Sequence, residues 1–335
     1  RAVTLQLDAL WGTGAVPTRV GNEARAAVEE FFPPSHGLAV FYSTGMEAVE
    51  FALRVARQVT GKKGVVGFNG CMHGKSMATA RLGWPNALAT LPDFHSLPYL
   101  PERSEGEILE SVRSTLATES IAAVFLEPLL GSRGGYIPSR PFAEQVSSLC
   151  AERGSLLIVD EIFTGFFRTG SPFLHRELGL TPDIVLIGKA MGNGFPVSGV
   201  VVDRRHPIAG SMLPGSTFAG NPLAASAVLA TLREMRAHDM PAKVHRIEEV
   251  ILAGLNGLTE LGVALRGKGA LWILELPTSM RVRDVMAHIL QHGVIMSPTA
   301  NYIRLLPSAT ITIEHLTDAC RIIREACRAQ RDIGR

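Results

Sequence analysis

Two aliphatic runs most constrain what this chain can fold into. Residues 156–159 lead directly into Asp160 and Glu161, and residues 184–188 form a second run that leads into Lys189. Neither run alternates with polar residues, which is typical of strands buried on both faces in a parallel sheet covered by helices. Ligands of such sheets bind outside the carboxyl ends of the strands, so Asp160 and Lys189 are predicted to face one pocket. Taken alone, Asp160 also fits a loop cap and Lys189 a surface lysine.

The order of the other elements predicts the fold class. Further strands are expected over residues 38–42, 65–68 and 121–126, and helical patterns separate them. This alternation indicates an α/β protein with a large, mostly parallel central sheet. Beyond about residue 240 the helices and strands predict a smaller α+β domain.

The expected domain organisation has three parts. An N-terminal segment covers residues 1–24, of which residues 1–22 are predicted to be irregular, and it is expected to be incomplete because the chain begins at Arg1. The large domain covers residues 25–237, and the small C-terminal domain covers residues 238–335. With 335 residues, the chain is long enough for one large core and a smaller satellite.

Composition excludes several classes of protein. The chain has 33 basic and 31 acidic residues, with no dense basic block, so no nucleic-acid partner is expected. Charged residues, glycines and prolines interrupt the apolar segments before they reach a membrane-spanning length, and there is no signal-peptide pattern. The sequence therefore predicts a soluble cytoplasmic protein without a membrane partner.

The cysteines predict no metal centre. Their spacing contains no CxxC pair, which favours reduced core thiols over a metal site. In the last expected helix, apolar side chains repeat at helical spacing and indicate core positions: Leu316, Cys320, Ile323 and Cys327.

A helix start near residue 44 indicates an anion site. Thr44 and Glu47 are spaced as a capping box, and Gly45 lets an anion approach the free N–H groups of the first turn. A capped helix without a ligand fits the same residues. The ending of residues 74–76, Gly-Lys-Ser, does not form a phosphate loop, because Asn69 stands where the first glycine is needed. In residues 215–224, the hydroxyls of Ser216 and Thr217 are further candidate phosphate donors.

The order of short motifs resembles the class III pyridoxal-phosphate-dependent aminotransferases, which have the type I fold of aspartate aminotransferase. The likeness spans roughly residues 35–312. The motifs are Ser-Thr-Gly-Met-Glu-Ala at 43–48, His-Gly at 73–74, Glu-Pro at 127–128, Asp-Glu-Ile-Phe-Thr-Gly-Phe-Phe-Arg-Thr-Gly at 160–170, Gly-Lys at 188–189 and Gly-Ser-Thr-Phe-Ala-Gly-Asn-Pro-Leu-Ala at 215–224. The segments 160–170 and 215–224 are the most specific.

The resemblance implies pyridoxal 5′-phosphate as cofactor and assigns two catalytic residues. Lys189 would hold the cofactor as a Schiff base and, once the substrate displaces it, move a proton between the substrate and the cofactor. Asp160 would pair with the pyridine nitrogen and keep it protonated.

The resemblance also implies the remaining binding residues and a homodimer with shared active sites. The phosphate would lie on the turn formed by Thr44, Gly45 and Met46, and would also accept a hydrogen bond from the partner subunit's Thr217. Ile162 would pack under the ring, and Glu127 would lie near its phenolic oxygen. Other residues implied around the cofactor are Met72 and His73. Arg304 resembles the arginine that grips the substrate carboxylate, a task suited to its planar fork.

Three positions depart from the family pattern. Met72 stands where an aromatic residue usually stacks on the cofactor ring. Phe163 stands where many members have glutamine, which removes a hydrogen bond to the cofactor. Ser132 stands where some members have an acid that pairs with the carboxylate-binding arginine.

A transaminase is the leading hypothesis for the activity. In it, an amino donor leaves its amino group on the cofactor as pyridoxamine phosphate, and an oxo acceptor then takes that group. Aminomutase, decarboxylase or racemase chemistry on the same scaffold is the alternative, and a catalytically inactive homologue is a third. Apolar residues at 72, 130 and 163 hint at an acceptor less polar than the small dicarboxylates.

Overall fold

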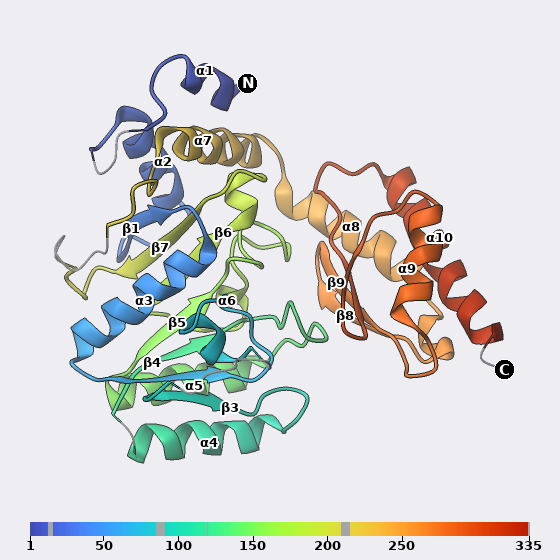
Figure 1. The fold of residues 1–335 in the computed structure, drawn as a ribbon, viewed down its shortest axis with the longest axis horizontal. Coiled ribbons are helices and arrows are strands. Elements are labelled where there is room, and N and C mark those ends of the chain that lie inside the picture. Colours follow the sequence, from blue (N-terminus) through green and yellow to red (C-terminus); the bar gives the residue numbers. More distant parts are fainter. Residues whose placement is uncertain (13–15, 85–90, 119, 209–214, 334–335) are drawn as a thin grey trace. The chain divides into compact units, whose positions relative to one another are not determined.

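The computed structural model describes residues 1–12, 16–84, 91–118, 120–208 and 215–333. The chain forms two compact units, each built around its own sheet (Figure 1). The first unit comprises Arg1–Pro128, Pro138–Phe166 and Phe173–His238. The second comprises Leu129–Ile137, Phe167–Pro172 and Asp239–Arg335.

The sheet of the first unit is mixed but mostly parallel. Its order is β1-β7-β6-β5-β4-β2-β3, and only β7 runs antiparallel to its neighbours. The strands are β1 (His36–Tyr42), β2 (Gly64–Phe68), β3 (Phe94–Leu97), β4 (Ile121–Leu126), β5 (Leu156–Asp160), β6 (Ile184–Gly188) and β7 (Ser198–Asp203). The predicted α/β class with a mostly parallel central sheet is confirmed.

Helices cover both faces of this sheet. The longer ones are α2 (Arg19–Glu29), α3 (Gly45–Thr60), α4 (Glu105–Thr118), α5 (Arg140–Arg153) and α7 (Pro222–Ala237), and the short ones are α1 (Ala2–Leu7), α6 (Leu174–Glu177), η1 (Thr79–Leu82) and η2 (Lys189–Gly192). On one face, α3 packs against Ile184 and Leu186 of β6. On the other, α2 and α7 pack against Val185 and Ile187. Within the described residues, no helix is long and apolar enough to cross a membrane.

The two aliphatic runs form neighbouring parallel strands, β5 and β6. Ile158 is paired with Ile184 and Asp160 with Leu186, and the residues of both strands are buried. Because the strands are parallel, their carboxyl ends lie at the same edge of the sheet. This edge carries Asp160 and Lys189.

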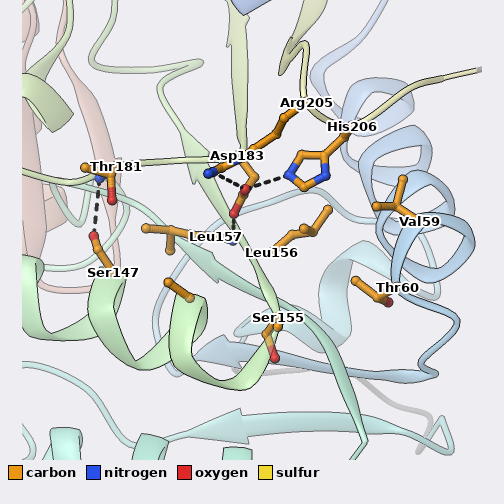
Figure 2. Close-up of a pocket in the computed structure, with 12 residues that line it drawn as sticks. Val59, Thr60, Ser147, Ser155, Leu156, Leu157, Thr181, Asp183, Arg205 and His206 are labelled. Carbon is orange, nitrogen blue, oxygen red and sulfur yellow. Dashed lines mark hydrogen bonds and ion pairs between the residues drawn. The ribbon is translucent and has the colours of Figure 1, made fainter. Parts of the chain in front are cut away.

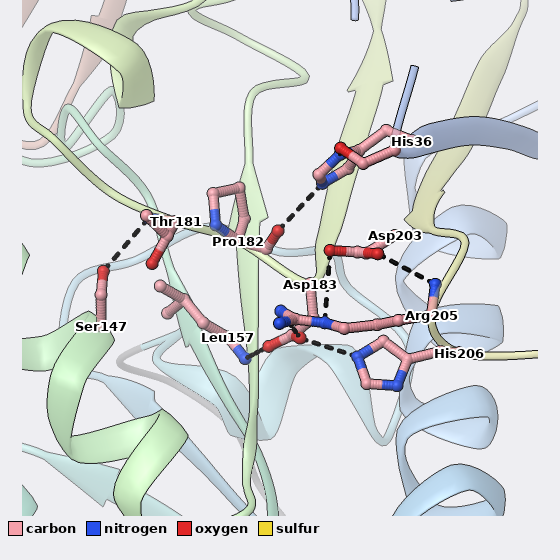
Figure 3. Close-up of polar contacts among 10 residues, drawn as sticks. His36, Ser147, Leu157, Thr181, Pro182, Asp183, Asp203, Arg205 and His206 are labelled. Atoms are coloured by element: carbon pink, nitrogen blue, oxygen red, sulfur yellow. Dashed lines mark hydrogen bonds and ion pairs between the residues drawn. The ribbon is translucent and has the colours of Figure 1, made fainter. Parts of the chain in front are cut away.

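The amino ends of the same strands are tied together by Asp183, which precedes β6. Figure 3 shows its buried carboxylate accepting hydrogen bonds from Leu157 N at 2.8 Å, Arg205 Nη2 at 2.7 Å and His206 Nε2 at 2.7 Å. Figure 2 shows these residues lining a cavity of about 510 Å³. Asp183 thus joins β5 and β6 to the turn after β7, at the edge opposite the predicted site.

The N-terminal prediction was wrong in detail. Residues 2–7 form α1, and α2 begins at Arg19 within the stretch expected to be irregular. Thr18 starts α2 by accepting a hydrogen bond from Gly21 N at 3.1 Å. The glycines and prolines of this segment hid the cap that Thr18 provides.

The second unit has an antiparallel sheet of order β10-β11-β9-β8, covered by three helices. Its elements are α8 (Met240–Gly254), η4 (Leu258–Leu261), β8 (Ala264–Lys268), β9 (Leu271–Glu275), α9 (Val282–Gln291), β10 (Ser297–Thr299), β11 (Tyr302–Leu305) and α10 (Ile313–Ile333). The residues predicted as core on the last helix are buried: Leu316, Cys320, Ile323 and Cys327. The short strands β8 and β10 were not predicted.

Candidate active site

Three charged residues follow the carboxyl ends of three adjacent strands in the first unit. Glu127 follows β4, Asp160 ends β5, and Lys189 follows β6. The first two are buried, with 4% and 5% of their surface exposed, whereas Lys189 is exposed. The arrangement places two carboxylates and an amine at one edge of the sheet, and for Asp160 and Lys189 this agrees with the prediction from the aliphatic runs.

Asp160 is paired with His73. His73 Nδ1 lies 2.8 Å from Asp160 Oδ2, and the other oxygen of Asp160 accepts from Ile162 N at 3.0 Å. Burial lowers the pKa of His73, but the hydrogen bond and charge of Asp160 outweigh it, so the pKa is raised overall. His73 Nε2 is buried without a hydrogen-bond partner among the described residues. The histidine therefore donates to the carboxylate and fixes its orientation.

Glu127 is a buried acid close to this pair. Its Oε2 accepts a hydrogen bond from Met72 N at 2.8 Å. Burial, opposed by His73 and supported by the charge of Asp160, raises the pKa of Glu127 to about 7. The carboxyl can therefore exist in both protonation states near neutral pH.

Lys189 occupies an unusual backbone position. Its φ is 40°, in the left-handed region that non-glycine residues rarely adopt, and it begins η2 directly after β6. Such conformations cluster at functional sites. Its Nζ lies 4.1 Å from the centroid of the Phe163 ring.

The start of α3 forms the predicted capping box. Glu47 N donates to Thr44 Oγ1 at 3.2 Å, and Thr44 N donates to Glu47 Oε2 at 2.8 Å. Ser216 Oγ reaches the same helix start and donates to Glu47 Oε1 at 2.9 Å. Ser198 Oγ donates to Thr44 O at 2.6 Å. The candidate phosphate turn is thus fixed by residues from three separate parts of the chain.

Ile162 joins this helix start to the end of β6. A Cβ atom on Gly45 would lie 2.9 Å from Ile162 Cδ1, and one on Gly188 would lie 3.3 Å from Ile162 Cγ2. A side chain at position 45 would therefore displace Ile162. Thr44 and Met46 of the turn are exposed, and so is Thr217.

Arg304 lies in the second unit, on β11. Its Nη2 donates to Ser297 Oγ at 2.6 Å, and its Nε is buried without a partner among the described residues. Burial lowers the pKa of this guanidinium. The group retains N–H donors able to bind an anion.

Sequence reasoning missed several supporting residues. Glu161 is fully buried and accepts hydrogen bonds from His175 N at 2.6 Å and from the Thr164 hydroxyl. This holds the loop that follows Asp160. Ser198 was also missed, since nothing in the local sequence marks a serine that bonds a residue so distant in the chain. Among the described residues, no group of three or more His, Cys, Asp or Glu side chains could hold a metal ion.

Residues 2–327 match the family model of Aminotransferase class-III. The chain is 33% identical to the 2-aminoadipate transaminase of Pseudomonas putida, over 90% of this chain and 80% of that protein. It is 34% identical to the acetylornithine aminotransferase of Bacillus subtilis, over 97% of this chain and 84% of that protein.

A solved structure shows the same fold. The ornithine aminotransferase of Toxoplasma gondii, described with pyridoxal phosphate at its active site, superimposes with a TM-score of 0.88 at 25% identity. The superposition covers 99% of this chain and 81% of that protein.

Proposed function

This chain belongs to the class III aminotransferases, and from that premise we propose that Lys189, Asp160 and the start of α3 bind its cofactor. The enzyme depends on pyridoxal phosphate and moves an amino group from a donor to an oxo acceptor. When bound, the cofactor supplies an aldehyde carbon that captures amines and a ring that takes up the electron pair left by C–H cleavage. The juxtaposition of Asp160 and Lys189 at the ends of β5 and β6 carries this proposal.

The described residues fit such a cofactor. The turn at Thr44 and Gly45 offers backbone N–H groups and a favourable helix dipole to a phosphate. Gly45 lacks the side chain that would displace Ile162, and Ile162 provides an apolar surface beside the turn. At the other end, the carboxylate of Asp160 suits a protonated ring nitrogen. Met72 provides a thioether for one face of the ring.

Two residues carry out the proton chemistry. The amine of Lys189 would hold the cofactor and, when released from it, would take a proton from the α-carbon of the substrate. Asp160 would hold a proton on the ring nitrogen, and its bonds to His73 and Ile162 keep it aligned. His73 is a positioning residue in this arrangement.

Glu127 gives a pH-dependent prediction. Its pKa is raised from 4.5 to about 7, so between these values the native state holds a proton that the unfolded chain has released. Stability therefore falls as pH rises through this window. Glu127→Gln cannot ionise, and its free energy of unfolding relative to wild type should rise by up to about 3 kcal/mol between about pH 5 and pH 8. Urea denaturation across this range measures the difference, and a constant difference would contradict the assignment.

A homodimer completes the proposal. We place the hydroxyl of the partner subunit's Thr217 at the phosphate turn, as the family resemblance implies, and Thr217 is exposed. The neighbouring Phe218 is 61% exposed, which favours burial against another subunit. Sedimentation equilibrium at micromolar concentration tests the dimer, and a monomer would refute it.

The buried free cysteines support a reducing, cytoplasmic location, which cell fractionation can test.

Arg304 is proposed to bind the carboxylate of the donor. Its guanidinium is partly buried and its Nε has no partner within the described part of the chain. Arg304→Ala should lower kcat/KM for amino acid donors by roughly 10- to 100-fold, the range for loss of a charge-assisted pair, and spare simple amines. Arg304→Lys keeps the charge without the fork and should recover part of the loss. Equal losses for both donor classes would make Arg304 a structural residue.

The reaction itself is tested by supplying an amino donor alone. Transamination should consume the aldehyde absorbance of the cofactor and release one equivalent of oxo product per site. Release of carbon dioxide or racemised donor as the main product would instead indicate a decarboxylase or racemase. A panel of donors and acceptors, beginning with the 2-aminoadipate and acetylornithine for which two relatives are named, would define the substrate.

A further inference from the structure

We propose that Phe163 is a holding site for the Lys189 ammonium and sets how readily this amine reacts when it is not bound to the cofactor. The inference rests on the proposed role of Lys189. Many family members carry glutamine at this position. The apolar side chain of Phe163 cannot make the hydrogen bonds of that amide, so it must act in another way.

The geometry follows from the strand register. The last paired residues of β5 and β6 are Asp160 and Leu186. Phe163 and Lys189 each lie three positions beyond that pair, one on each strand extension. The chain thus brings the two side chains together above the carboxyl edge, and Nζ lies 4.1 Å from the ring centroid. This is well within the distance at which an aromatic face attracts a cation.

The loop that carries Phe163 is firmly held. Glu161, two residues before Phe163, accepts from the hydroxyl of Thr164, which directly follows Phe163, and from His175 N. Asp160 accepts from Ile162 N at 3.0 Å. These hydrogen bonds hold the backbone around the ring.

The aromatic face favours the charged form of the amine over the neutral form. Only the neutral amine can attack an aldehyde, so the ring lowers the reactive fraction at neutral pH. Glu127 also acts on the charge of Lys189, and Asp160 and His73 act in turn on Glu127. These groups are the same in every Phe163 variant, so a comparison of the variants measures the effect of the aromatic ring alone on the reactivity of the Lys189 amine.

The test uses the full chain freed of cofactor. Acetic anhydride labels neutral amines. Mass spectrometry of the peptide containing residue 189 gives the extent of labelling relative to a free amine standard. A pH series then gives the midpoint pH at which the amine becomes reactive. Phe163→Met keeps an apolar side chain but removes the ring, and Phe163→Tyr keeps the ring. The Met variant should label about two- to fivefold faster near pH 7, with a lower midpoint, and the Tyr variant should match wild type. The rate of pyridoxal phosphate capture should rise by the same factor in the Met variant.

Two outcomes would overturn the proposal. One is an unchanged midpoint in the Met variant with a native circular dichroism spectrum. The other is a Tyr variant that changes as much as the Met variant. Phe163→Leu provides the same comparison if the Met variant does not fold. If Lys189 is not the cofactor lysine, the Lys189→Ala variant will keep its cofactor. The labelling of Lys189 in the Phe163 variants does not depend on that outcome. Failure of the proposed cofactor role and failure of the Phe163 proposal are therefore distinguishable.

Discussion

Replacing Lys189 by alanine is expected to abolish both the absorbance of protein-bound cofactor and transamination. The alanine offers no amine to the cofactor aldehyde and no base to the substrate α-carbon, so covalent binding and proton transfer are lost together. Turnover should fall by at least about 10⁴-fold, the scale seen when a covalent nucleophile is removed. Absorbance after addition of pyridoxal phosphate and single-turnover rates measure the two effects.

Lys62→Ala is the matched control. It removes a lysine whose Nζ donates to the carbonyls of Arg153, at 2.5 Å, and Gly154, just before β5 begins. The change in charge is the same, but it occurs near the amino end of the strand that bears Asp160. Cofactor binding should persist in this variant. Turnover retained by Lys189→Ala would overturn the assignment of the cofactor lysine.

The central strands could be predicted from sequence because their signal is local. Residues 156–159 and 184–188 lack polar alternation, and burial on both faces is the arrangement that satisfies such runs. The capping box of Thr44 and Glu47 is likewise encoded within a single helical turn. The structure confirms both predictions, and in each case the signal lies in residues close together in the sequence.

The contacts that shape the site could not be predicted in the same way. His73 and Asp160 are separated by 87 positions, and Ser198 and Thr44 by 154. The Asp183 carboxylate joins β5, β6 and the turn after β7, although in sequence it reads as an ordinary loop acid. Such bonds depend on strand order, which periodicity does not reveal. The resemblance to the aminotransferase family identified the candidate site residues, but it did not identify the residues that hydrogen-bond to them.

Asp160→Asn is expected to separate catalysis from cofactor retention. The amide keeps the size of the carboxylate and can still accept from Ile162 N, which bonds Oδ1 at 3.0 Å. It removes the negative charge that holds a proton on the ring nitrogen, so the ring accepts electrons less well. The rate of α-proton removal should fall on the order of 10²- to 10³-fold, as when one preorganised electrostatic partner is lost. Cofactor affinity should change far less, because Lys189 and the turn at Thr44 remain.

Stopped-flow measurement of the half-reaction with α-deuterated donor resolves this prediction. A larger isotope effect in Asp160→Asn than in wild type would show that proton removal has become the slow step. His73→Gln is the companion variant, since it keeps a donor for Asp160 Oδ2 at the position where His73 Nδ1 lies 2.8 Å away. It should lose less activity than Asp160→Asn, because a positioning residue acts only through the carboxylate. If both variants lost cofactor in proportion to rate, the pair would instead serve to retain the cofactor.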